Sequence, residues 1–145
     1  MTRAIGGSLL LLAGGLGSRM WGKNKLYLEL GGAPLLGQIL TRLSPLFDET
    51  LLLAAKGGAR EARERLGPLL NRWNVRITED RAEGRGPLEG LCRGLAAMNG
   101  EWGLLLGCDM PFADEAVLRG MAALRAEETD VVTAEIGGWL EPLHA

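Results

Sequence analysis

Histidine is almost absent from this chain of 145 residues, and the one present, His144, is next to the last residue. This argues strongly against a histidine-based zinc site and against a serine–histidine–aspartate triad, since both need a well-held imidazole. Cysteine is scarce as well: Cys92 and Cys108 lie far apart and form no C-x-x-C pair. We interpret them as reduced thiols, as expected in the cytoplasm.

The chain also lacks a surplus of positive charge and a long hydrophobic run. Its formal net charge is −2 at pH 7, which argues against a broad surface for nucleic acid. The leucine run at residues 9–12 is far shorter than the ~18 apolar residues of a membrane span. It is not followed by the small-residue cleavage pattern of a signal peptide. We therefore predict a cytoplasmic protein that binds neither nucleic acid nor a membrane.

What the chain does have is an ordinary globular composition with extra glycine. Hydrophobic residues make up 47% and charged residues 23%, and the length suits one domain with its own core, which we predict over residues 1–145. The 22 glycines are about twice the usual share of ~7%. Such a surplus favours loops in which the backbone approaches a ligand closely.

Apolar runs and amphipathic stretches alternate along most of the chain. The runs predict strands at Ser8–Ala13, Thr50–Ala55, Asn74–Thr78, Gly103–Leu106 and Asp130–Ala134, and a short extended piece at Lys25–Leu30. The amphipathic stretches predict helices at Pro34–Leu43, Ala59–Trp73, Pro87–Asn99 and Asp114–Glu128. This order is typical of βαβ units, so we predict an α/β fold: a three-layer αβα, Rossmann-like domain with a mainly parallel sheet.

The most polar loops follow three of the predicted strands, after Ala13, Thr78 and Leu106. Ligands of such sheets bind at the carboxyl ends of the strands. These three loops would meet at that edge of the sheet, which makes them the expected functional site.

The first of these loops has the composition of a phosphate site. Its glycines allow backbone N–H groups to face an anion, and Arg19, Lys23 and Lys25 add three cations within a few residues. A nucleoside triphosphate is the ligand that this combination suits best.

A P-loop is an alternative for the same loop. Gly17, Gly22 and Lys23 match the Walker A spacing, but Asn24 stands where that motif needs the hydroxyl of Ser or Thr. A P-loop would also require an α-helix beginning at this lysine. The hypothesis of a P-loop NTPase stays open on the sequence alone.

Three ordered motifs resemble those of the molybdenum cofactor guanylyltransferases, within the nucleotidyltransferase superfamily. The first is L-A-G-G at residues 12–15 with Arg19-Met20, Lys25 and G-A-P-L-L at 32–36. The second is Asp80 with G-P-L-E-G at residues 86–90, and the third is G-C-D-M-P at residues 107–111. The resemblance implies a fold of the nucleotidyltransferase type.

The same resemblance implies an activity and a set of site residues. Members of the family transfer GMP from GTP to molybdopterin and release pyrophosphate. The implied roles are the nucleoside for Leu12, Ala13 and Gly14, the phosphates for Gly15, Arg19 and Lys25, the GTP site for Asp80, and Mg²⁺ for Asp109. Arg19, Lys25 and Asp109 would be the catalytic residues, with Mg²⁺ as cofactor.

Three further expectations go with the resemblance. A cytidylyltransferase, or another NTP transferase of the superfamily, is the first alternative, because L-A-G-G differs from the cytidylyl pattern L-A-A-G by one letter. A nucleotide-binding protein without catalysis is another, because the chain ends at Ala145, before a strand and helix that the family has, and so looks C-terminally truncated. GTP and molybdopterin are the expected partners, together with proteins that mature molybdoenzymes.

Overall fold

A parallel sheet is the centre of the fold. The computed structural model describes residues 4–13, 19–20, 23–83 and 85–141. Within them, four parallel strands pair in the order β7-β6-β1-β8. Their bounds are β1 Ser8–Leu12, β6 Glu49–Ala54, β7 Arg76–Glu79 and β8 Gly103–Gly107. The mainly parallel sheet predicted from the sequence is confirmed.

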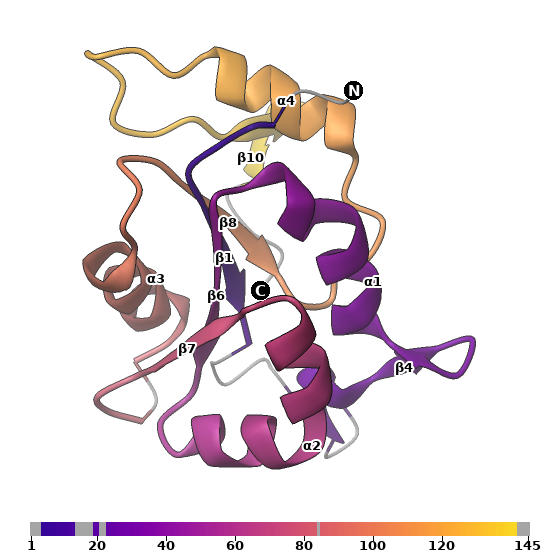
Figure 1. The fold of residues 1–145 in the computed structure, drawn as a ribbon. Coiled ribbons are helices and arrows are strands. Elements are labelled where there is room, and N and C mark those ends of the chain that lie inside the picture. The colour runs from indigo at the N-terminus through magenta and orange to yellow at the C-terminus, as the bar shows by residue number, and fades with distance from the viewer. Residues whose placement is uncertain (1–3, 14–18, 21–22, 84, 142–145) are drawn as a thin grey trace.

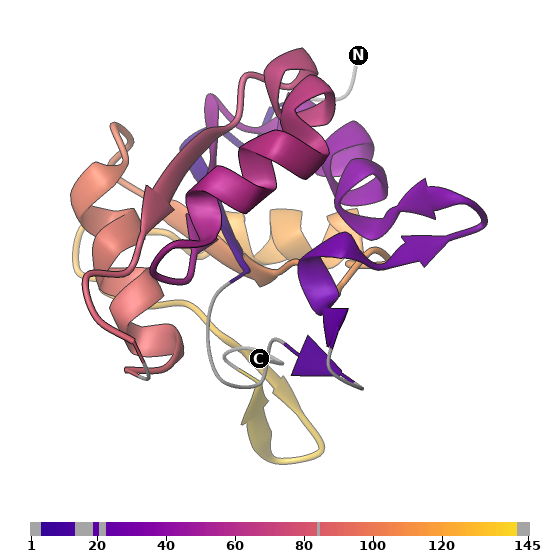
Figure 2. The same cartoon turned by 90° about the horizontal axis from the view of Figure 1, so that it is seen from below.

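Helices cover both faces of the sheet, as Figures 1 and 2 show together. Side chains of a strand alternate between faces, so Leu9 and Leu11 join the larger core on one face while Leu10 and Leu12 join a second cluster on the other. The larger core receives helices α1 Leu35–Leu43, α2 Gly58–Arg72 and α4 Glu115–Ala123. The second cluster lies under α3 Pro87–Ala97. The αβα layering is thus confirmed.

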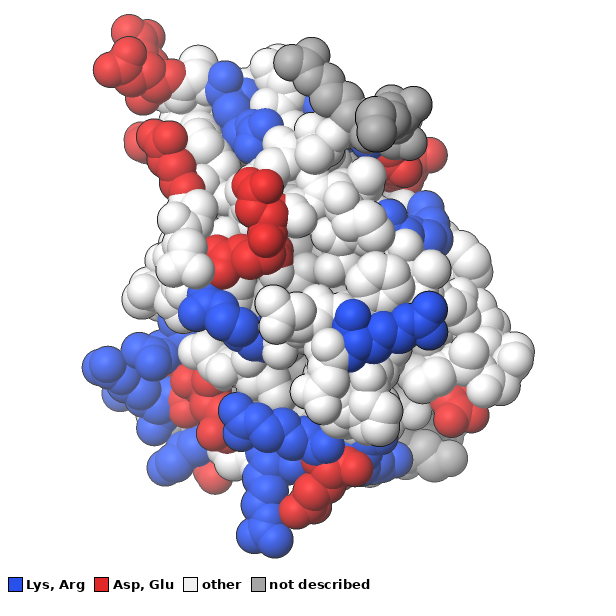
Figure 3. Space-filling view, viewed as in Figure 1, with Lys and Arg blue, Asp and Glu red and all other residues white. Residues whose placement is uncertain are grey.

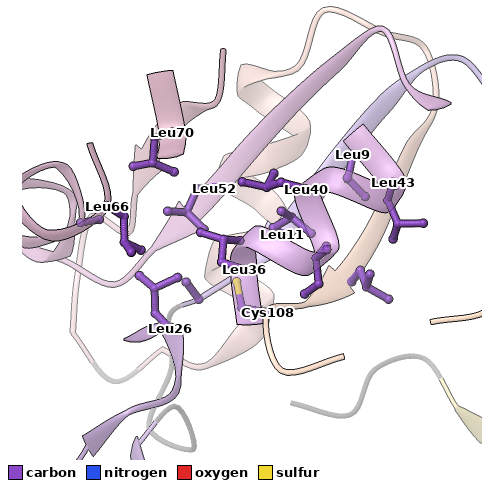
Figure 4. Close-up of a cluster of buried hydrophobic side chains, with 14 of the residues drawn as sticks. Leu9, Leu11, Leu26, Leu36, Leu40, Leu43, Leu52, Leu66, Leu70 and Cys108 are labelled. Atoms are coloured by element: carbon purple, nitrogen blue, oxygen red, sulfur yellow. The ribbon is translucent and has the colours of Figure 1, made fainter. Parts of the chain in front are cut away.

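The larger core extends to the edge of the sheet where the polar loops begin. Figure 4 shows Leu11, Leu36 and Leu52 around the middle of this cluster, with the sulfur of Cys108 beside Leu36. Leu11, Leu36 and Leu52 are fully buried, and Cys108 is 4% exposed. This cysteine therefore packs as a small apolar residue beneath the loop that follows β8.

Short elements connect β1 to α1. They are β2 Arg19–Met20, β3 Lys23–Asn24, the 3₁₀ helix η2 Lys25–Tyr27, β4 Glu29–Leu30 and β5 Ala33–Pro34. A second 3₁₀ helix, η3 Ser44–Leu46, follows α1. The extended piece predicted at Lys25–Leu30 is wrong in its first half. The side chain of Asn24 accepts a hydrogen bond from the backbone N–H of Leu26, which starts a helical turn instead.

The last predicted strand is also wrong. Residues 130–133 form no strand, and the chain continues into an antiparallel hairpin of β9 Ala134–Ile136 and β10 Trp139–Glu141. Leu105 of β8 and Val131 line one cavity of about 330 Å³, so this segment faces the sheet across a gap. Gly137 and Gly138 have φ values of 60° and 84°, which only glycine adopts readily and which close the hairpin.

Helix α4 is shorter than the sequence predicts, since it ends at Ala123 and not near Glu128. The guanidinium of Arg125 donates to the carbonyls of Ala122 and Ile5. A basic side chain can satisfy a carbonyl of the last turn, so these bonds hold the observed end of α4 in place.

The surface in Figure 3 carries charges of both signs. Basic and acidic side chains intermix at the bottom of this view, where α2 lies. Two ion pairs on α2, Arg60–Glu64 and Arg65–Glu61, each span four residues of the helix. Among the described residues, no helix has both the length and the apolar character needed to cross a membrane.

Glu49 ties together the amino-terminal edge of the sheet. Its carboxylate accepts hydrogen bonds from Ser8, from the backbone N–H groups of Asn99 and Gly100, and from the Arg76 guanidinium. Burial raises the pKa of this carboxyl, but these hydrogen bonds outweigh burial, and the pKa lies below its ordinary value.

The low pKa of Glu49 predicts a pH-dependent contribution to stability. Its stabilisation is complete above the unfolded-state pKa of ~4.3 and is lost as pH falls through the lower folded-state pKa. We expect Glu49→Gln to lower the free energy of unfolding by about 1–3 kcal/mol near pH 7, since hydrogen bonds to a charged group are lost.

Chemical denaturation of both proteins between pH 3 and pH 7 measures this difference, which should shrink as the wild-type carboxyl protonates. Glu64→Gln, in an exposed pair on α2, is the matched control and should change stability by less than ~1 kcal/mol. A constant difference down to pH 3 would contradict the assignment.

Candidate active site

Three loops begin at the carboxyl edge of the sheet, as the sequence predicts. Backbone hydrogen bonds continue one residue past the strands and fix where each loop starts. They run from Ala13 N–H to Leu53 O, from Cys108 N–H to Leu12 O, and from Asp80 N–H to Ala54 O, at 2.9, 3.1 and 3.0 Å. The chain therefore leaves β1, β8 and β7 at the same edge.

An ion pair lies at this edge between two of the predicted catalytic residues. Lys25 Nζ is 3.0 Å from Asp109 Oδ2, although the two residues are 84 positions apart in the sequence. Their side chains are 25% and 28% exposed, so the pair is partly shielded and still reachable from solvent. A cation and a carboxylate held together at a strand end suit the binding of a phosphorylated ligand.

Local contacts hold the lysine in place. The neighbouring Leu26 is only 4% exposed and belongs to the larger core. On its other side, the ring of Tyr27 lies under the guanidinium of Arg65, 3.8 Å from the ring centre to Cζ, which attaches this turn to α2. Together with the Asn24 cap, these contacts aim Lys25 at the strand edge.

Sequence reasoning missed these supporting roles. In the sequence, Asn24 drew notice only because it lacks the hydroxyl of a Walker A motif. Asn is a preferred N-cap residue, so the sequence could have predicted the helical turn that follows it. The contact between Tyr27 and Arg65 joins distant segments and leaves no local signal.

The loop after β8 presents Asp109 while keeping its neighbour inert. Burial, and then the nearby Asp109 charge, raise the pKa of the Cys108 thiol far above its ordinary value. A thiol held protonated in the core is not a nucleophile. Of these two neighbours, Asp109 is therefore the candidate functional side chain of this loop.

Asp80 lies at the same edge but apart from the ion pair. Two strands separate β7 from β8, so three spacings of ~4.8 Å put their ends about 14 Å apart. The aspartate instead faces the start of α3, which lies so close that a Cβ at Gly90 would be 2.7 Å from Leu12 Cδ1 and 3.7 Å from Asp80 Oδ1. Burial and the charge of Glu89 raise the pKa of Asp80, and the charge of Arg93 opposes them.

The structure thus brings some of the predicted site residues together and separates others. Lys25 contacts Asp109, and Leu12 and Ala13 are buried at the end of β1 beside them. Asp80 marks the opposite part of the edge. Gly14 and Gly15 lie outside the described residues, as does the side chain of Arg19, whose backbone is in β2.

The sequence of this chain matches a known protein family and several curated relatives. Residues 9–145 match the family described as the MobA-like NTP transferase domain. The chain belongs to this family. A molybdenum cofactor guanylyltransferase of Pseudomonas aeruginosa (strain LESB58) is 35% identical over 95% of the chain and 66% of its own length. That of Pseudomonas fluorescens (strain Pf0-1) is 36% identical over 83% of the chain and 58% of its own length.

Solved structures support the same fold. A nucleotidyl transferase from Methanothermobacter thermautotroptrophicus is 28% identical with a TM-score of 0.63, over 81% of this chain and 56% of that one. A molybdopterin-guanine dinucleotide biosynthesis protein A from Archaeoglobus fulgidus is 24% identical with a TM-score of 0.56, over 79% and 53%, which supports the fold alone. The chain spans 58–68% of the length of the curated relatives described above and of one from Pseudomonas entomophila.

The geometry of this MobA-like domain does not fit a P-loop. Lys23 and Asn24 form strand β3, and the residues after them make a 3₁₀ helix of three residues. A P-loop needs an α-helix at this point, with its N-terminus directed at the phosphates. The P-loop alternative is therefore wrong.

Asp109 fits the requirements of a magnesium ligand in part. Among the described residues there is no group of three or more His, Cys, Asp and Glu side chains that could hold a metal ion. Mg²⁺ at nucleotide sites commonly takes one or two carboxylates and completes its shell with phosphate oxygens and water. A partly exposed Asp109 suits that arrangement, in which the nucleotide supplies the remaining ligands.

We expect the Lys25–Asp109 pair to contribute little to folding. Partly exposed ion pairs are worth ~0–1 kcal/mol, because solvent screens them. In a double-mutant cycle of Lys25→Met and Asp109→Asn, urea unfolding should give a coupling free energy below about 1 kcal/mol. A coupling of several kcal/mol would mean that the pair serves the fold and not a ligand.

Proposed function

We propose that this chain carries the GTP site of a Mg²⁺-dependent guanylyltransferase that transfers GMP from GTP to molybdopterin and releases pyrophosphate. The observation that carries the proposal is the Lys25–Asp109 contact at the carboxyl edge of the sheet. The names of the relatives from Pseudomonas support GTP and molybdopterin as the substrates. We further propose that the protein acts in the cytoplasm and contacts proteins that mature molybdoenzymes.

The proposed reaction needs positioning and charge neutralisation more than covalent chemistry. A phosphate oxygen of molybdopterin attacks the α-phosphorus of GTP, the new P–O bond forms, and the bond to pyrophosphate breaks. Lys25 and Arg19 would offset negative charge on the leaving pyrophosphate. Asp109 would hold Mg²⁺, which when bound neutralises phosphate charge.

The nucleoside would lie along the rest of the edge. Leu12 and Ala13 end β1 and are 7% and 8% exposed, and the Leu12 carbonyl and the Ala13 N–H already bond to neighbouring strand ends. We propose that these two residues form the floor against which the nucleoside lies, with Gly14 also on the nucleoside and Gly15 on the adjoining phosphates. Asp80, across the edge from Asp109, would take part on the side of the sugar and base.

Nucleotide selectivity is the first prediction of this proposal. GTP with Mg²⁺ should raise the thermal unfolding midpoint more than CTP or ATP does. A ligand at ~100 times its Kd adds about 2.7 kcal/mol of stability. For a domain of this size that is a shift of roughly 5–10 °C. A larger shift with CTP would support a cytidylyltransferase, and no shift with any nucleotide would contradict a triphosphate site in this chain.

Loss of the lysine should reduce nucleotide binding while leaving the fold intact. Lys25→Met removes the cation that faces the phosphates, and we expect the Kd for GTP with Mg²⁺ to rise about 10-fold or more, the scale of one charge-assisted hydrogen bond. Isothermal titration measures it. Arg60→Met, on the exposed face of α2, is the control and should bind GTP as the wild type does.

Turnover distinguishes catalysis from binding alone. Incubation with radiolabelled GTP and molybdopterin should yield labelled dinucleotide and pyrophosphate in equal amounts. Binding of GTP without turnover by this chain would support the alternative of a nucleotide-binding protein that does not catalyse the transfer.

A further inference from the structure

Helix α1 is hydrogen-bonded to both segments that carry the Lys25–Asp109 pair. At its amino end, the N–H of Leu35 donates to the carbonyl of Leu28 at 2.9 Å, which joins the helix to the turn that carries Lys25. Near its carboxyl end, Arg42 reaches the loop that carries Asp109. One helix therefore links two segments that are far apart in the sequence.

Arg42 makes two hydrogen bonds to the Asp109 loop. Its Nη1 donates to the carbonyl of Pro111, and its Nη2 donates to the carbonyl of Ala113 at 2.9 Å. The planar guanidinium presents two parallel N–H groups, so one side chain can hold two carbonyls of one loop. A lysine has no such fork.

Apart from the Lys25–Asp109 contact and the bond from Cys108 N–H to Leu12 O at the strand end, the other hydrogen bonds given for this loop are local. The N–H of Met110 donates to Gly107 O, and that of Ala113 donates to Met110 O, both at 3.3 Å. The Asp114 carboxylate caps α4 by accepting from Ala116 and Val117. These bonds shape the loop but do not attach it to the rest of the molecule. The bonds from Arg42 do so across 69 and 71 residues.

The helix between the two contacts is a rigid spacer. Its inward side chains Leu36, Ile39, Leu40 and Leu43 are no more than 1% exposed. With a rise of 1.5 Å per residue, Leu35 and Arg42 are about 10 Å apart along the axis. Because the helix is held in the core, neither end can shift without disturbing that packing.

We propose that Arg42 is a positioning residue of the active site. By attaching the Asp109 loop to α1, it sets the distance between the Asp109 carboxylate and the Lys25 ammonium. The relevance of this distance to GTP rests on the proposed function. The attachment itself does not, so the two can be tested apart.

The test compares Arg42→Ala and Arg42→Lys with a control on the same helix. Gln38 donates from Nε2 to the carbonyl of Leu30 at 3.2 Å, so Gln38→Ala also removes an exposed hydrogen bond from α1 to a backbone carbonyl, but not one of the Asp109 loop. Hydrogen exchange is measured without nucleotide, and the Kd for GTP with Mg²⁺ is measured by titration.

In Arg42→Ala we expect the amides of Met110 and Ala113 to exchange about 10-fold faster and the Kd to rise about 10-fold, the scale of one charge-assisted hydrogen bond. Arg42→Lys should recover only part of both changes, and Gln38→Ala should show neither. Exchange over β1 and β6 should stay as in the wild type in all three, which shows that the fold is intact.

Unchanged exchange in Arg42→Ala would overturn the attachment, and faster exchange with an unchanged Kd would overturn the positioning role. If the wild type does not bind GTP, the proposed function fails, while the exchange of the loop still decides whether Arg42 attaches it.

Discussion

The whole arrangement depends on the pairing of strand β1 with two neighbours at once. Each of its residues from Ser8 to Leu12 is aligned with one residue of β6 and one of β8, and all five are buried. A parallel strand in this position must be apolar on both faces, which explains the unbroken run of leucines. Its carboxyl end can then be followed only by a loop that leaves at the edge of the sheet. That constraint brings Ala13, the residue before the glycine-rich segment, to the edge of the sheet where the loop with Asp109 begins.

The carboxyl edge and the amino edge of the sheet use charge in opposite ways. At the amino edge, Glu49 accepts several hydrogen bonds from one set of fixed donors, and its low pKa reflects a carboxylate that is fully engaged by the protein. At the carboxyl edge, Lys25 and Asp109 form an ion pair, with about a quarter of each side chain exposed. Solvent screens such a pair, so its partners can be exchanged at small cost in free energy. The first arrangement serves the fold, and the second suits the exchange of partners that the proposed GTP site requires.

The sequence was sufficient for the features that arise from local periodicity and strand ends. Buried strands, four helices and the common edge of the polar loops follow from apolar runs such as Leu9–Leu12 and from the rule that parallel strands end at one edge. The prediction errors concern places where a single hydrogen bond or a contact with a distant segment accompanies the local structure. Asn24 caps a 3₁₀ helix where an extended piece was expected, and Arg125, just past the early end of α4, donates to the carbonyl of Ile5, 120 residues away. No window of sequence contains that second contact.

The ion pair shows the same division between local and distant causes. That Lys25 and Asp109 would lie near one edge follows from the positions of their loops, but a separation of 3.0 Å requires both loops to be held against a common support. Loop conformations are otherwise broad, since each free backbone residue has ~1–2 kcal/mol of conformational entropy to lose. Helix α1 supplies the support because its apolar face is fully packed, while its exposed Arg42 remains free to reach outward to the loop after β8. The buried face of α1 fixes the position of the helix, and Arg42 then holds the loop after β8 at a fixed distance from it. In this way two loops at the edge of an α/β sheet acquire a defined spacing.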